Sequence, residues 1–463
     1  MQSRCRSSAA ESSSTEDCHV ALSPLAPRLQ LRRCTSAGEA PEYLRCDPVI
    51  LGSRIFFFSK SLDGAYDLQF AMVLDVASLN LRAVRVMGSL PTRCHCKFVV
   101  VAECLCVIPC DTKGLGDLKQ IFVLNSAEQD RVYSQGCYVE ADVPSSAYLH
   151  TEVVGRSCVI FCHDGDGNVD LARTCVLDTE MLSLRTVGNM LAPPPSEISG
   201  DSMSKCAIAV VGFKILLFLQ DAEECWSLDK AWLVDFNLGM ARRQIDFEKG
   251  FVPPNSEADS MVVGQNVYIF PKDFSGCYDF GSVVVVDTSA CTMSRVSFEA
   301  SKMPEENTRA NILVLKRTKG MACSSKTDGE CLLLIPELDG RTDFEQTRLI
   351  DPGSSVLAPS VDIVKLEVRD LDLSEEMCYE VVGERVYVLP GNRAANNLAA
   401  KRIAVLNPFE ERCQTFAADF LVSRNAGFDV ERVGSHLVFV PYDSRHRRSV
   451  QDVSLLDCSL DQT

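Results

Sequence analysis

Residues 164–170 have the spacing of oxygen ligands that could bind a metal ion. Alternate positions of this stretch carry side-chain oxygens, at Asp164, Asp166, Asn168 and Asp170. Such oxygens in a glycine-bearing loop can converge on a hard cation such as Ca²⁺. An EF-hand loop, however, has Gly where Val169 stands and a bidentate Glu where Cys175 stands. We therefore predict a chain without a cofactor, in which this stretch is a solvated acidic hairpin loop, and keep calcium as the alternative.

A basic cluster near the C-terminus could bind an anionic partner. It consists of Arg445, His446, Arg447 and Arg448, and Arg393 falls in a similar loop earlier in the chain. Guanidinium groups form forked hydrogen bonds with carboxylates, so an acidic peptide is the partner that these residues would suit. The alternative is a solvated loop whose positive charges balance nearby acids.

The cysteines and histidines suggest packing rather than catalysis. Cys94 and Cys96 are two positions apart, as are Cys104 and Cys106, so each pair points to one face of a strand instead of forming a zinc knuckle. The six histidines fall in no spacing typical of a nucleophile or a catalytic metal. We predict no catalytic residue.

Composition limits the possible partners. The net charge of −17 disfavours nucleic acid and anionic lipid. The longest mostly apolar stretch, residues 206–219, is too short to span a membrane. The N-terminal stretch lacks the apolar segment of a secretory signal, and the 22 cysteines are scattered through strand-like runs. These features predict a cytoplasmic protein with reduced cysteines that contacts neither nucleic acid nor a membrane.

The elements that would position these residues recur along the chain. A glycine that follows two apolar residues is succeeded 23 positions later by an aspartate, as from Gly52 to Asp75 and from Gly264 to Asp287. Five such pairs have this spacing, Gly383 to Asn407 spans 24 positions, and Ala102 replaces the glycine ahead of Asn125. The glycine predicts a tight hairpin turn, and the aspartate or asparagine begins a second turn by binding its own backbone.

The pattern within each repeat predicts four strands, the number found in one blade of a β-propeller. A nearly all-apolar strand such as residues 283–286 indicates burial on both faces, between neighbouring blades. A more polar strand follows it, as in residues 81–86, and suits an outer edge. The innermost strands carry mainly Val, Ile, Met and Cys, which disfavours a site in the central channel.

This pattern resembles the kelch repeat, from residue 42 to residue 460. The kelch glycine pair after the second strand is absent, and the Trp expected six positions after the aspartate is replaced by residues such as Leu81, Leu184 and Met293. The resemblance implies an all-β fold, a single propeller of four-stranded blades, eight or alternatively seven in number. It implies no particular activity, because kelch-like propellers serve many functions.

The predicted organisation is a disordered tail over residues 1–26 and a propeller over residues 27–460. The repeats lie near residues 43–88, 94–136, 148–188, 204–246, 258–300, 309–350, 378–420 and 428–460. In the sixth, we expect an edge strand around residues 347–349 and a long excursion over residues 351–377. Residues 28–34 have the alternation of the strand that the last repeat lacks, so they are expected to close the ring.

The function predicted from these features is that of a non-catalytic scaffold. Its loops on one face would bind a protein or peptide, since recognition usually lies in variable loops on a rigid frame. An enzyme or small-ligand protein that uses the central channel is the alternative. The oligomeric state and the identity of the partner do not follow from the sequence.

Overall fold

The structure is a computed structural model of the whole chain. It describes residues 31–33, 35–36, 43–125, 131–188, 203–221, 223–248, 255–304, 308–317, 329–338, 341–353, 355–368, 377–390, 402–417 and 427–459. The tail predicted for residues 1–26 and the predicted binding residue Arg393 lie outside these ranges.

The recurring element is an antiparallel meander of four strands, which we call a unit. The first units are β3 (Cys46–Leu51), β4 (Arg54–Lys60), β5 (Tyr66–Asp75) and β6 (Asn80–Gly88); β7 (Arg93–Val101), β8 (Cys104–Cys110), β9 (Phe122–Asn125) and β10 (Arg131–Gly136); and β12 (Tyr148–Val154), β13 (Ser157–His163), β14 (Val169–Asp178) and β15 (Ser183–Thr186). The next are β16 (Met203–Val211), β17 (Lys214–Gln220), β18 (Trp226–Asp235) and β19 (Ala241–Gln244); and β21 (Asn255–Val263), β22 (Asn266–Lys272), β23 (Val284–Asp287) and β24 (Thr292–Arg295).

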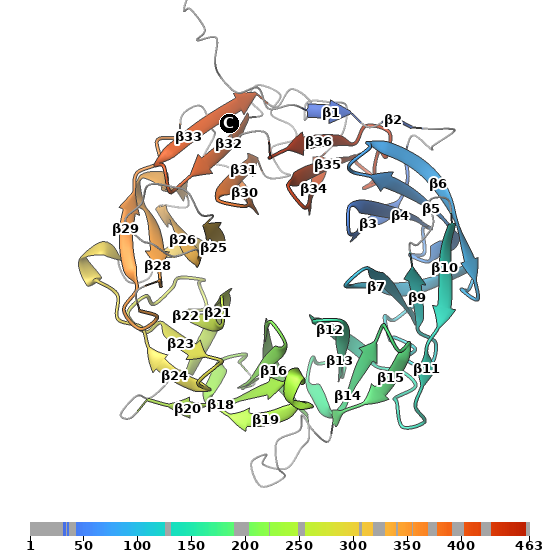
Figure 1. Cartoon of the computed structure of the whole chain (residues 1–463), viewed down its shortest axis with the longest axis horizontal. Coiled ribbons are helices and arrows are strands. Elements are labelled where there is room, and N and C mark those ends of the chain that lie inside the picture. The colour runs from blue at the N-terminus through green and yellow to red at the C-terminus, as the bar shows by residue number, and fades with distance from the viewer. Residues whose placement is uncertain are drawn as a thin grey trace, which may run out of the picture.

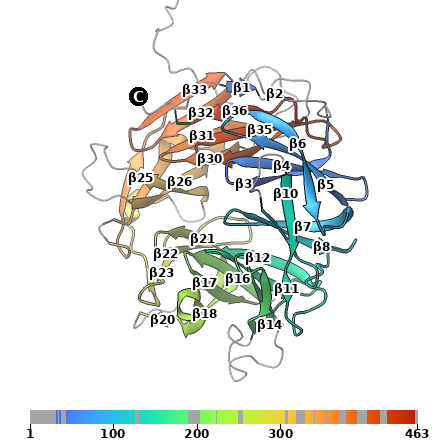
Figure 2. The same cartoon turned by 45° about the vertical axis from the view of Figure 1, so that its right-hand side comes forward.

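The C-terminal part of the chain continues the pattern. Its units are β25 (Arg309–Arg317), β26 (Gly329–Leu338), β28 (Thr347–Asp351) and β29 (Ser360–Val364); and β30 (Met377–Val382), β31 (Arg385–Pro390), β32 (Arg402–Asn407) and β33 (Arg412–Ala417). The final strands are β34 (Gly427–Val433), β35 (His436–Tyr442) and β36 (Ser454–Asp457). The strand β1 (Leu31–Arg33) pairs antiparallel with β36, and Figure 2 shows the two side by side.

The units are arranged around a common centre (Figure 1). The first strand of each unit lies nearest the centre, and the last lies at the periphery. The fold is therefore a β-propeller, as the repeats predicted. Among the described residues, no helix is both long and apolar enough to cross a membrane.

The hydrophobic core is divided among the interfaces between neighbouring units. One cluster joins Ile55 and Phe57 of β4 to Val438 and Val440 of β35, and these four side chains are 0% exposed. The predicted all-apolar strand at residues 283–286 is at most 2% exposed, so its burial on both faces is confirmed. Burying each large side chain of this kind contributes roughly 1.5–3 kcal/mol, and the ring of interfaces is the main source of stability.

The two predicted turns are also confirmed. The hairpin glycines have φ between 59° and 64°, and Ala102 takes the same role with φ 52°. At the second turn, Asp287 Oδ1 accepts hydrogen bonds from the backbone N–H groups of Ser289 (2.8 Å) and Ala290 (2.9 Å). The corresponding aspartates Asp75 and Asp178 cap their turns in the same way.

The unit that begins at β25 differs from its prediction. We expected residues 347–349 to be the outer strand, but β28 pairs with β26 on one side and with β29 on the other. The outer strand is therefore β29, within the stretch predicted as an excursion and beyond the predicted repeat end at residue 350. Asp351 explains the difference, because its Oδ1 accepts the N–H of Gly353 (2.8 Å) and so begins the second turn.

Short additional strands, which the sequence did not predict, lie outside the units. The strands β2 (Thr35–Ser36), β11 (Tyr138–Val139) and β20 (Asp246–Phe247) pair in parallel with β6, β15 and β24. A further short strand, β27 (Arg341–Thr342), pairs with β26. Single-turn 3₁₀ helices occur at η1 (Phe236–Leu238), η2 (Ala300–Lys302) and η3 (Phe344–Gln346).

Candidate functional site

The predicted calcium loop and the predicted basic loop are copies of one structural element. This element is a five-residue loop between the second and third strands, closed by a bond from the N–H of its first residue to the carbonyl of its fifth. It begins at Ser61, Asp111, Asp164, Asp221, Asp273 and Asp443. Each first residue follows the hairpin glycine, or Ala102, by nine positions. This second spacing was present in the sequence and was missed.

Asp164 stabilises its own loop. Its Oδ1 accepts hydrogen bonds from the backbone N–H groups of Asp166 and Asn168, and its Oδ2 accepts one from the Asn168 side chain, all at 2.9 Å. The bond from the Asn168 side chain is the main reason that the pKa of Asp164 is lowered. The described residues contain no group of three or more His, Cys, Asp or Glu side chains arranged to hold a metal. Calcium at this loop stays the alternative to the predicted solvated loop.

Most of the basic cluster is engaged within the protein. Arg447 Nη2 lies 2.7 Å from Asp443 Oδ2, and its guanidinium stacks over Tyr43 at 5.3 Å from the ring centroid. His446 occupies the left-handed position of the loop and stacks on Tyr442. Arg445 is exposed. An anionic partner would therefore meet Arg445 first, and its predicted binding role stays a prediction.

Arg448 links the last unit to the first. Its Nε lies 2.8 Å from Asp429 Oδ2, and its Nη1 lies 3.3 Å from Asp47 Oδ1. Its backbone N–H and carbonyl both bond to Leu44 at 2.8 Å. The side chain is 18% exposed, so its geometry is that of a structural connection rather than of a free ligand group.

The residues that correspond to Arg448 connect other neighbouring units. Tyr66 pairs with Cys94 of β7, and Trp226 pairs with Ser256 of β21. Tyr278 forms an isolated bridge to Thr308. The residue that follows each five-residue loop is therefore the point at which one unit hydrogen-bonds to the next, whatever its side chain.

The innermost strands carry more charge than the sequence analysis suggested. The pKa of Glu431 on β34 is raised to about 7, chiefly by burial and also by the neighbouring Asp429, while Arg448 opposes the shift. Burial also raises the pKa of Glu380 on β30. At Asp47, burial is outweighed by hydrogen bonds from Tyr66 and Lys60, which lower the pKa. The centre of the ring thus holds carboxyl groups with divergent acidities.

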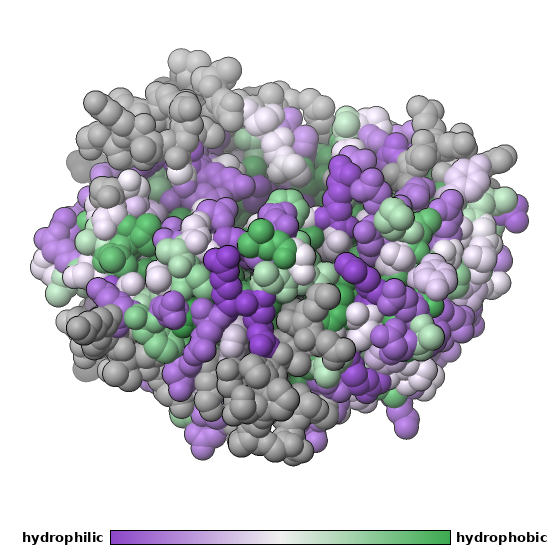
Figure 3. All heavy atoms as spheres, turned by 60° about the horizontal axis from the view of Figure 1, so that its bottom comes forward, coloured by the Kyte–Doolittle hydropathy of each residue, from purple (hydrophilic) through white to green (hydrophobic). Residues whose placement is uncertain are grey.

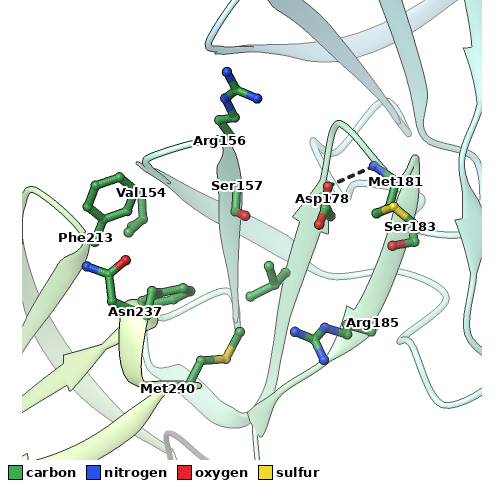
Figure 4. Close-up of a pocket in the computed structure, with 12 residues that line it drawn as sticks. Val154, Arg156, Ser157, Asp178, Met181, Ser183, Arg185, Phe213, Asn237 and Met240 are labelled. Carbon is green, nitrogen blue, oxygen red and sulfur yellow. Dashed lines mark hydrogen bonds between the residues drawn. The ribbon is translucent and has the colours of Figure 1, made fainter.

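A cavity of about 580 Å³ lies between the β12–β15 unit and the β16–β19 unit (Figure 4). Its walls combine apolar residues with an equal number of polar or charged ones. The lining residues are Val154, Arg156, Ser157, Val176, Asp178, Met181, Ser183, Arg185, Phe213, Phe236, Asn237 and Met240.

Large apolar side chains are exposed at the edge of this cavity. Met181 is 73% exposed, Phe213 is 50% exposed and Leu238, beside the lining residue Asn237, is 56% exposed. Figure 3 shows hydrophobic residues among hydrophilic ones on the side of the ring that carries β16 to β20. Exposed apolar side chains that gather around a cavity are typical of interaction sites.

The cavity and the five-residue loops lie at opposite ends of the same strands. Strand β13 begins at Ser157, which lines the cavity, and ends at His163, next to the loop of Asp164. Seven residues of strand extend over roughly 20 Å. The sequence predicted binding through loops that include the basic cluster, whereas the cavity opens on the face of the hairpin tips. The sequence feature that could have indicated this cavity was the presence of two apolar residues, Phe213 and Met181, at turns where polar residues are usual.

Comparisons with known proteins find similar solved structures but no match in sequence. No family model matches the chain, and no curated protein matches it. The chain is similar to the β-propeller domain of the Trilobed protease from Pyrococcus furiosus, with 9% identity and a TM-score of 0.38 over 82% of this chain and 98% of that chain. It is also similar to apo AztD from Citrobacter koseri, with 9% identity and a TM-score of 0.40 over 86% of this chain and 88% of that chain.

Proposed function

We propose that this chain is a non-catalytic, kelch-like propeller that binds a protein or peptide. Its ring would contain eight four-stranded blades and would be closed by the N-terminal strand. The pairing of β1 with β36, the bridge between Leu44 and Arg448 and the core cluster shared by β4 and β35 support that closure. The buried thiols of Cys106, Cys158 and Cys175 pack as apolar side chains, in keeping with a cytoplasmic protein.

The observation that carries this proposal is the cavity between the β12–β15 and β16–β19 units. Binding energy at protein interfaces is concentrated in a few aromatic and arginine side chains near a well-packed pocket. Phe213 and Met181 stand at the cavity edge, and Arg185 belongs to its lining. We therefore place the binding face at the hairpin tips around this cavity, rather than at the five-residue loops.

Affinity purification followed by mass spectrometry tests the proposal. Wild-type protein is compared with the double variant Phe213→Ser, Met181→Ser and with the control Phe274→Ser. Phe274 is 73% exposed, like Met181, but lies in a five-residue loop. We expect the double variant to lose specific partners that the control retains. Loss of partners from Phe274→Ser or Arg445→Ala instead would assign binding to the loop face.

The alternative function, an enzyme or a small-ligand protein that uses the centre of the ring, has one observation in its favour. Glu431 has a pKa of about 7, and a carboxyl group with a raised pKa is typical of acid–base sites. A metabolite screen by thermal shift distinguishes the two functions. A ligand whose stabilisation is lost in Glu431→Gln but kept in Phe213→Ser would favour the central site.

A further inference from the structure

The apolar part of the cavity is an opening in the core between two units. Val154, Val176 and Met240 belong to the buried cluster that joins the β12–β15 unit to the β16–β19 unit, and they also line the cavity. The Phe213 ring lies over the hairpin tip at Gly155, where a Cβ atom would collide with it. An apolar side chain that entered this space would therefore continue an existing core.

One charged group is directed into this space without a carboxylate partner. In Figure 4 the Arg185 side chain extends from β15 toward Met240, whereas Arg156 points away from the cavity. Arg185 is exposed, and no ion pair or hydrogen bond of its guanidinium to the described residues is present. Its five N–H donors match the geometry of a carboxylate.

The acidic residues near the cavity are already engaged. Asp178 Oδ1 accepts the backbone N–H groups of Glu180 and Met181 at 2.9 Å, so this carboxylate caps its own turn. Glu180 lies 3.4 Å from Arg156, in a pair whose side chains are 71% and 76% exposed. The remaining charge of the chain acts weakly on the cavity, because charges beyond about 8 Å are screened at physiological salt. Arg185 is therefore the charge that decides which ligands the cavity favours, and it favours a carboxylate.

We propose that the cavity binds an extended peptide segment of a partner protein in which an acidic residue and a large apolar one lie two positions apart, so that both side chains point to the same face. The acidic side chain pairs with Arg185, and the apolar side chain packs between Phe213 and Met240. This inference rests on the proposed function and specifies the chemistry of the partner. Hydrogen bonds of Ser157 and Ser183 to the peptide backbone would orient the segment, since both hydroxyls line the cavity.

Fluorescence anisotropy with labelled synthetic peptides tests the inference. The probe carries Leu and Glu two positions apart, and the comparison peptides replace that Glu by Lys or that Leu by Ser. We expect wild-type protein to bind the Leu–Glu peptide at least about tenfold more tightly than either comparison peptide. Arg185→Gln and Phe213→Ala should each weaken that binding about tenfold, which is the loss of one charged hydrogen-bonded contact or one buried ring. Arg85→Gln, an exposed arginine on β6, should leave it unchanged.

Several outcomes would overturn the inference. These are no binding of the Leu–Glu peptide to wild-type protein, equal binding of the Leu–Lys peptide, or full binding by Arg185→Gln. Displacement of the peptide by octanoate at equal concentration would assign the cavity to small carboxylates instead. If purified partners still depend on Phe213 in any of these cases, the proposed function stands and only the chemistry of the partner is wrong.

Discussion

Arg448 Nη1 lies 3.3 Å from Asp47 Oδ1, although 401 positions separate the two residues in the chain. The same guanidinium bonds to Asp429, and Nη1 also donates to the carbonyl of Cys46. Arg448 thus connects Asp429 of β34, in the last unit, to Asp47 of β3, in the first unit. Its position in the sequence suggests a surface loop, and its contacts make it part of the ring.

Arg448→Met should therefore destabilise the protein by roughly 2–4 kcal/mol, because it leaves Asp429 partly buried without its cation, while Asp47 retains only its ion pair with Lys60. Urea unfolding followed by intrinsic fluorescence measures the change. Arg445→Ala is the matched control and should stay within about 0.5 kcal/mol of wild type. Similar values for the two variants would show that the Arg448 contacts contribute little.

Removal of β1 should also lower stability. A chain that begins at Thr35 lacks the strand that pairs with β36, whereas a chain that begins at Ala26 retains it. We expect the shorter chain to melt several degrees lower, since each kcal/mol corresponds to about 2–4 °C in a domain of 150–250 residues and less in a larger one. Equal melting temperatures would mean that the pairing is dispensable.

Ala102→Gly should stabilise the protein by about 0.5–1 kcal/mol. Ala102 has φ 52°, where an L-residue is strained by about 1–2 kcal/mol, and the greater entropy of unfolded glycine offsets part of the relief. The converse change Gly264→Ala tests strain alone, because its Cβ would meet no atom within 4 Å. Gly155→Ala adds a collision with Phe213 and should cost more than Gly264→Ala in thermal melts. Equal costs would contradict the contact.

Glu431 should make the protein less stable as pH rises from about 4.5 to about 7. Its folded pKa is about 7 against an ordinary value of 4.5, so in this window the folded state binds more protons than the unfolded state. Glu431→Gln should remove this loss and gain at most about 2 kcal/mol at pH 8, after allowance for solvent screening. Urea unfolding at pH 5 and pH 8 measures it. Glu103→Gln, at an exposed hairpin tip, should show no such difference.

The strands and turns were predictable because their determinants are local. A hairpin glycine and a turn-forming aspartate 23 positions apart act on neighbouring backbone, and alternation of apolar residues indicates which strands are covered. The prediction was wrong at β28 and β29, because the sequence ahead of β26 lacks the glycine after an apolar residue that marks most of the other repeats. Asp351 was the turn residue there, and it was read as the start of a loop.

The candidate site was less predictable than the strands. Arg447 and Arg448 were assigned to a binding surface because they cluster in the sequence, yet their partners are Asp443 and the distant Asp47. The loop of Asp164 resembled a calcium site because the side chain that caps a turn and the side chain that binds a cation are chemically the same. A short sequence pattern does not distinguish these roles.

The sequence by itself determined a repeated four-stranded element, an acidic all-β chain and the positions of most turns, because each depends on residues within one repeat. Only the tertiary structure decided where a cavity opens and which arginine faces it. Val154 and Met240 meet there because two units pack side by side. How well the surfaces of the two units fit depends on side-chain volumes, and the spacing of residues in the sequence does not reveal these.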